Sequence, residues 1–241
     1  ESTIEQQGDL NLATVDQTGY NGTDANTSDI LQIGDGNIAD VTQNGNLNDS
    51  NIVQRFGNDA TVTQSGTENV SNVDQGDANT ATVDQSGDRN LSDVNQHHPS
   101  FESDSNEATV TQSGNDNVST VNQNGPLPNG LSLDNTATVE QSGDWNVSTV
   151  TQDDFNTASV LQTGLGTAAN PNTVDITQFN DGDTASATQL IGAGNSIVIE
   201  QEQCCTGPAG ADNFAGAVQA GDNNTTTIIQ LRNSPPVGPP A

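Results

Sequence analysis

A seven-residue phrase, Asn-x-Ala/Ser-x-Val-x-Gln, returns about every eleven residues along almost the whole of this 241-residue chain. Residues 58–64 and 79–85 are clean copies. The fixed residues are two positions apart, so on a β-strand they all point to one face. A short period repeated along an entire chain is typical of a stacked array of strands and not of an enzyme domain.

The small residue of the phrase alternates between two types. Successive phrases carry Ala13, Ser28, Ala39, Ser50, Ala60, Ser71, Ala81, Ser92, Ala108, Ser119, Ala137 and Ser148. Further on, every second phrase keeps Ala while the others drift to Val174, Ile197 and Thr226. A coil of two strands, each stacked on its like in the next coil, explains this alternation. The sequence therefore predicts an all-β fold, a β-solenoid with two strands per coil and about nine to ten coils, over residues 1–233. The Pro-rich segment 234–241 is predicted to leave it as a C-terminal tail.

Asn and Gln recur at the inward positions of the phrase. Stacked amides at equivalent positions donate to one neighbour and accept from the other, so they form ladders that fix the register of the coils. The predicted ladder residues are Asn37, Asn58, Asn79, Asn135, Gln17, Gln43, Gln64, Gln85, Gln112 and Gln141.

Composition alone argues against an ordinary globular core, because only 29% of the residues are hydrophobic and the net charge is −29. The periodicity overrides the expectation of disorder, since small inward residues close a narrow core between two sheets. With 32 acidic residues and three basic ones, the chain is not expected to bind nucleic acid or an anionic membrane.

The acidic residues fall mostly at outward positions, such as Asp16, Asp84 and Glu140. Like charges on adjacent strands of a column would lie about 4.8 Å apart, so such a surface favours screening by salt or divalent cations. We therefore expect a saline habitat and no cofactor beyond loose screening by Ca²⁺ or salt.

The residues outside the repeat give no indication of a membrane span, a metal site or a catalytic site. No stretch is long and apolar enough to span a membrane, and no signal peptide is visible, so we expect Glu1 to be a mature terminus. Cys204 and Cys205 allow a vicinal disulfide, an intermolecular link or two free thiols. His97 and His98, in an acidic loop, are interpreted as solvated residues in preference to a metal site. No catalytic constellation is present, so we expect no enzyme.

The repeat resembles the curlin family, the major subunits of curli-type amyloid fibres. The resemblance rests on residue type and approximate spacing at Gln17-Gly19, Asn37-Ala39-Gln43 and Gln64-Gly66-Asn69, and it covers nearly the entire chain. It implies a subunit that is secreted through a chaperone, assembles on a nucleator outside the cell, and forms fibres of the biofilm matrix. The chain departs from the family in having about twice the usual repeats, a far more acidic surface and five long insertions.

Two functions follow from the sequence. The first is a structural subunit that polymerises with itself, head-to-tail, into amyloid-like extracellular fibres for adhesion or matrix. The alternative is a monomeric solenoid that binds ice or a surface through outward Thr columns, which include Thr61, Thr82, Thr109 and Thr138.

The predicted polymerisation joint involves Ser2, Ile4 and Gln6 at one end and Gln230 at the other. Ser-type strands begin and end the chain, so like-on-like stacking of copies leaves one strand of the Ala-type column missing at every joint. We expect the short first strand to fill this place, either by leaving its own column or by reaching into the neighbouring subunit.

Overall fold

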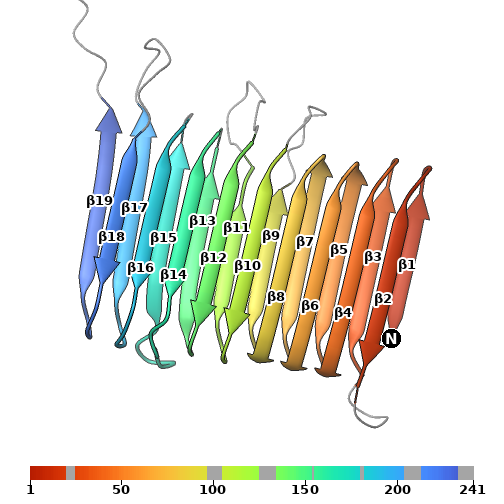
Figure 1. Ribbon diagram of the computed structural model, residues 1–241, viewed down its shortest axis with the longest axis horizontal. Coiled ribbons are helices and arrows are strands. Elements are labelled where there is room, and N and C mark those ends of the chain that lie inside the picture. Colours follow the sequence, from red (N-terminus) through yellow and green to blue (C-terminus); the bar gives the residue numbers. More distant parts are fainter. Residues whose placement is uncertain are drawn as a thin grey trace, which may run out of the picture.

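In the computed structural model, two flat stacks of parallel strands face one another along the whole length of an elongated body (Figure 1). The structure describes residues 1–19, 25–96, 105–124, 134–153, 155–179, 182–203 and 213–232. The chain passes from one sheet to the other after every strand, and consecutive strands run in opposite directions (Figure 1). Two strands therefore make one coil, as the alternation of Ala and Ser predicts.

Odd-numbered strands form a ten-stranded sheet and even-numbered strands form a nine-stranded sheet. The ten-stranded sheet consists of β1 (Ser2–Gln7), β3 (Thr27–Ile33), β5 (Asp49–Phe56), β7 (Val70–Asp77), β9 (Leu91–Gln96), β11 (Val118–Asn122), β13 (Asn146–Gln152), β15 (Asn172–Phe179), β17 (Ser196–Gln203) and β19 (Thr225–Arg232). The nine-stranded sheet consists of β2 (Leu12–Thr18), β4 (Ile38–Asn46), β6 (Asp59–Thr67), β8 (Thr80–Asp88), β10 (Glu107–Ser113), β12 (Thr136–Ser142), β14 (Thr157–Gln162), β16 (Thr184–Gln189) and β18 (Phe214–Gln219).

The register stacks like on like, which confirms the predicted columns. Ala39 lies beside Ala60 in the nine-stranded sheet, and Ser50 lies beside Ser71 in the ten-stranded sheet. A one-residue slip would turn every inward side chain to the surface, so the period of two and the narrow core together fix this register.

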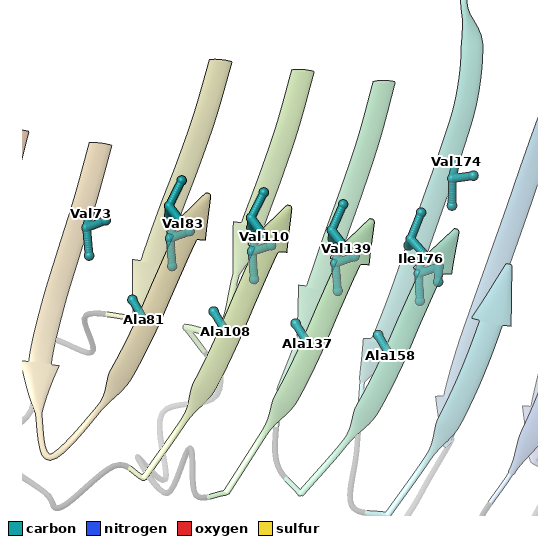
Figure 2. Packing of buried hydrophobic residues seen from close by; sticks show 14 of the residues in the cluster. Val73, Ala81, Val83, Ala108, Val110, Ala137, Val139, Ala158, Val174 and Ile176 are labelled. Atoms are coloured by element: carbon teal, nitrogen blue, oxygen red, sulfur yellow. The ribbon is translucent and has the colours of Figure 1, made fainter. Parts of the chain in front are cut away.

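The core is a thin layer of Ala, Val and Ile between the two sheets. Val62, Val83 and Val110 are fully buried, and Ala and Val form regular rows from coil to coil (Figure 2). Small side chains allow the sheets to approach closely, which is how a chain with few hydrophobic residues still closes a core.

The corners between strands use left-handed backbone. The residue before a ladder Asn has a positive φ at Leu47, Glu68 and Arg89, among others. At the corner that follows the nine-stranded sheet, glycines stack on one another. A Cβ added to Gly66 would lie 2.0 Å from the carbonyl oxygen of Gly87 in the next coil. Only glycine fits there, because the backbones of adjacent corners are nearly in contact.

Candidate functional site: the amide ladders and the two ends

Gln side chains form a continuous hydrogen-bonded ladder inside each sheet, and every Gln from Gln32 to Gln201 is almost fully buried. In both ladders each Gln Nε2 donates to the Oε1 of the Gln in the next coil toward the C-terminus. Gln64 Nε2 lies 2.9 Å from Gln85 Oε1, and Gln85 Nε2 lies 2.8 Å from Gln112 Oε1. The contacts run without a gap from Gln6 to Gln230 and from Gln17 to Gln219.

The same Nε2 groups also tie the two sheets together, which the sequence did not suggest. From Gln17 onward, each Gln Nε2 donates a second hydrogen bond to a backbone carbonyl at the start of the preceding strand, in the opposite sheet. Gln43 Nε2 lies 2.7 Å from the oxygen of Thr27, and Gln54 Nε2 lies 2.7 Å from that of Ile38. Each ladder Gln from Gln17 to Gln219 therefore uses both amide protons, and removing an interior one would leave several buried groups unpaired.

Asn ladders at the two corners run in the opposite sense. Asn48 Nδ2 donates to Asn26 Oδ1, and Asn69 Nδ2 donates to Asn48 Oδ1, so these bonds point toward the N-terminus. Most of these Oδ1 atoms also accept the backbone N–H of the next residue in the column, as Asn48 Oδ1 does from Asn69 at 3.0 Å. One predicted column contains Asp183, which is 2% exposed and occupies an Asn position.

Backbone contacts fix the direction of both ladders. Side-chain amide nitrogen and oxygen look alike, so their assignment depends on their partners. A backbone carbonyl requires a donor, which identifies each Gln nitrogen, and a backbone N–H requires an acceptor, which identifies each Asn oxygen. The two ends of the solenoid are therefore chemically different.

The predicted ladder residues are all where the sequence analysis placed them. Gln43, Gln64, Gln85, Gln112, Gln141, Asn37, Asn58, Asn79 and Asn135 are buried, and Gln17 lies half-buried in the first coil.

The turns carry a further set of side-chain acceptors. Asp88 Oδ1 accepts the backbone N–H of Thr67 at 3.0 Å, and Asn115 Oδ1 accepts that of Asp88 at 3.0 Å. A carboxylate or amide in each of these turns thus caps the turn of the preceding coil. The irregular spacing of these turn residues hid this role in the sequence.

The Ser column behaves differently from the amide columns. The hydroxyls of Ser28, Ser50, Ser71, Ser92 and Ser119 are buried without a hydrogen-bond partner among the described residues. Further along the same sheet Val174 and Ile197 occupy this position. The position therefore does not require a hydroxyl, which explains why the Ser-type phrases drift.

The first strand stays in its own column. Ser2 lies beside Ser28, Ile4 beside Ile30 and Gln6 beside Gln32. The first expected route, in which this strand leaves its column, is therefore wrong for the single chain, because β1 pairs in parallel with β3. The second route, in which it reaches into the neighbouring subunit, stays a prediction. Ile4 is 45% exposed, whereas Ile30 is 2% exposed, so the outer side of β1 is an open end of the core.

Each end leaves ladder groups without the partners that interior coils supply. Gln6 Nε2 donates to Gln32 Oε1 at 2.6 Å but has no backbone acceptor among the described residues. At the other end, Gln230 Nε2 donates to the carbonyl of Phe214 at 2.9 Å and has no following Gln. The N-terminal end thus offers Gln oxygens, and the C-terminal end offers the second N–H of Gln230, whereas Gln219 Nε2 already donates to Ser196 O and to Thr226 Oγ1.

The outer surface distributes its acidic residues more evenly than expected. Among the strand registers of the described residues, no Asp or Glu lies directly beside another: Asp40 lies between Thr14 and Thr61, and Asp84 lies between Thr63 and Thr111. The expected repulsion between directly adjacent carboxylates is therefore absent from these registers, because at least one neutral residue separates successive carboxylates in a column.

Repulsion remains along the diagonals. Partial loss of hydration raises the pKa of Asp93, and the charge of Asp74 adds to the effect. The same two causes, with Glu200 as the neighbour, raise the pKa of Asp175. A hydrogen bond with Glu200 raises the pKa of Glu202. Two ion pairs, Arg55 with Asp74 and Arg89 with Asp116, offset part of the charge.

The outward Thr column is continuous over four strands, from Thr61 through Thr82 and Thr109 to Thr138, and Asp40 separates it from Thr14. Among the described residues, no three His, Cys, Asp or Glu side chains gather to hold a metal ion. None of the described segments forms a helix that could cross a membrane. Cys204, Cys205, His97, His98 and the tail at 234–241 lie outside the described residues.

These features define a class: an all-β solenoid of two parallel sheets, held in register by opposed Gln and Asn ladders and open at both ends. Within that class, residues 134–164 match the family model described as curlin associated repeat, which confirms the resemblance to the curlin family over this segment. The chain has no match among curated proteins.

Proposed function

We propose that this protein is a secreted structural subunit that polymerises head-to-tail into amyloid-like extracellular fibres, which serve a biofilm matrix or adhesion. The observation that carries the proposal is the pair of unfinished ends. Among the described residues both sheets are open, with backbone edges and amide groups that an identical chain would complete. The matched curlin repeat supports the same conclusion. The nucleator and the secretion chaperone that the resemblance implies would be its other partners, and no enzymatic role is proposed.

Electron microscopy of the purified chain in saline buffer, combined with fibre diffraction, tests the proposal. Unbranched filaments with a meridional reflection at about 4.8 Å are expected, because the strands lie perpendicular to the long axis. Discrete rods of single-subunit length at all concentrations would contradict it.

The Thr column favours a second candidate, binding to ice or another ordered surface by a monomer. Carboxylates such as Asp84 and Glu140 flank this column on neighbouring outward positions, which breaks the flat hydroxyl array. Thermal hysteresis of the monomeric protein measures this activity directly. A clear freezing-point depression that Thr82→Asp and Thr109→Asp abolish would favour the second candidate.

A further inference from the structure

The described residues of this 241-residue chain form an odd number of strands, β1 to β19, and this parity determines how two copies of the chain as given fit together. The ten-stranded sheet has β1 and β19 at its ends, and the nine-stranded sheet has β2 and β18. If a second copy is placed with like sheets in line, β1 follows β19. The gap between β18 and the next β2 is then two strand spacings, with one strand missing.

A half-turn about the long axis removes that gap. The ten-stranded sheet of the next copy then continues the nine-stranded sheet of the first, so β1 follows β18 and β2 follows β19. The repeat permits this exchange because strands of both sheets carry an inward Gln and an inward aliphatic residue, which is Val or Ile in most strands and Ala217 in β18, and because Ala and Ser are both small. We propose, resting on the proposed function, that successive subunits in the fibre are related by a half-turn, so that β1 of each copy completes the nine-stranded sheet of the copy before it.

The unfilled hydrogen-bonding groups fit this arrangement. Every Gln from Gln17 onward donates to a backbone carbonyl at the start of the preceding strand: Gln17 to Glu1, and Gln32 to Leu12. In the half-turn joint the strand preceding β1 is β19, so Gln6 Nε2 of the next copy meets the carbonyl of Thr225. With like sheets in line, the preceding strand is the missing one, and Gln6 still lacks this acceptor.

The ladders continue with the correct direction. Gln230 would donate to Gln17 Oε1 of the next copy, as each Gln does within the chain. Gln219 would donate to Gln6 Oε1 of the next copy in place of its present hydrogen bond to Thr226 Oγ1. The Asn ladder would continue from Asn224, whose Nδ2 donates to Asn195 Oδ1, to Asn11 of the next copy. Joining two N-terminal ends would oppose Gln oxygens, and joining two C-terminal ends would oppose Gln N–H groups, so growth is polar.

Outward Thr residues distinguish the two joints. In the half-turn joint Thr227 of β19 lies beside Thr14 of the next copy. With like sheets in line, Thr227 lies beside Thr3 instead. All three side chains are exposed. Adjacent parallel strands bring Cα atoms to about 5 Å, within reach of a disulfide, whereas positions on opposite faces of the solenoid are too far apart.

The experiment uses the full chain with Cys204→Ser and Cys205→Ser as background. Thr227→Cys is mixed with an equal amount of Thr14→Cys or of Thr3→Cys, filaments are grown and oxidised, and heterodimers are counted by mass spectrometry. We expect the Thr14→Cys mixture to give at least about tenfold more heterodimer than the Thr3→Cys mixture, because only that pair is adjacent.

Filaments in which the Thr3→Cys mixture cross-links as well or better, or in which neither mixture cross-links, would overturn the half-turn while leaving polymerisation intact. Homodimers of Thr227→Cys alone would overturn the polarity. Absence of filaments in the background protein overturns the proposed function, and the half-turn falls with it.

Discussion

Gln85 makes three side-chain hydrogen bonds in the middle of the array. Its Nε2 donates to Val70 O and Gln112 Oε1, and its Oε1 accepts from Gln64. Gln85→Ala is expected to lower the free energy of unfolding by about 3 kcal/mol or more, because it leaves buried groups unpaired and opens a cavity.

Chemical denaturation of the monomer measures this loss. Asp84→Ala on the same strand is the matched control, since Asp84 is exposed and belongs to no ladder. We expect it to change stability by less than about 0.5 kcal/mol. Similar losses for both variants would show that the ladder does not hold the fold.

Asp183 is the one acidic residue in the Asn columns. Its backbone N–H donates to Asn156 Oδ1, and its own Oδ1 accepts from the backbone of Asn213. An ionised carboxylate cannot donate along the ladder, and its burial is costly. Asp183→Asn is therefore expected to stabilise the protein by about 1 kcal/mol.

The melting temperature of Asp183→Asn checks this expectation. Asp84→Asn makes the same substitution at an exposed position and separates the ladder effect from the effect of replacing an Asp by Asn elsewhere on the protein. A melting temperature that falls, or that rises equally in both variants, would contradict the ladder argument.

At the scale of elements, the glycine corner sets how closely the coils stack. A Cβ on Gly66 would meet the carbonyl of Gly87, whereas a Cβ on Gly57 would meet nothing within 4 Å, although both residues have positive φ. Gly57→Ala is expected to cost about 1 kcal/mol for its left-handed backbone. Gly66→Ala should cost about 3 kcal/mol or more, because the corner must move apart.

Urea denaturation gives the free energy of unfolding of each variant. Both variants carry the cost of a left-handed backbone, so the additional loss in Gly66→Ala measures the close approach of Gly66 to Gly87. If Gly66→Ala were no worse than Gly57→Ala, the spacing of the coils would not depend on this column of glycines.

At the scale of the whole molecule, acid should stabilise the fold. The pKa values of Asp93, Asp175 and Glu202 are raised, so the folded chain binds protons more tightly than the unfolded chain. Stability is then lowest above the raised pKa values and grows as the pH falls toward the ordinary values near 4.

Denaturation midpoints between pH 7 and pH 4 test the sign. The expected midpoint rises on acidification, and the triple variant Asp93→Asn, Asp175→Asn, Glu202→Gln should show a flatter profile. A midpoint that falls steadily over this range would contradict the assigned direction of the shifts.

Salt should shorten the lag of assembly. With a net charge of −29, two copies repel one another as they approach, and ions screen that repulsion over about 10 Å at 0.1 M. Light scattering at a fixed protein concentration over a series of NaCl concentrations measures the lag. A lag time that does not change from low to high salt would show that electrostatic repulsion between subunits does not limit assembly.

The sequence by itself determined the two-stranded coil. A period of two places the small residues of every strand on one face, and that face is buried when two sheets of such strands pack against each other. The alternation of Ala13, Ser28 and Ala39 separated the strands into two sheets, and the inward Asn and Gln predicted the ladders. These are local patterns, and every coil repeats them.

Only the tertiary structure decided what depends on the alignment of distant coils. Insertions of unequal length hide which outward residues become neighbours, so the separation of Asp40 and Asp84 from other carboxylates emerged only with the register. The opposed directions of the ladders required the backbone contacts of Gln43 and Asn26, whose partners Thr27 and Asn48 lie on other strands or corners of the solenoid. The structure likewise corrected the expectation that the first strand leaves its column. β1 forms backbone hydrogen bonds with β3, and leaving the sheet would break them.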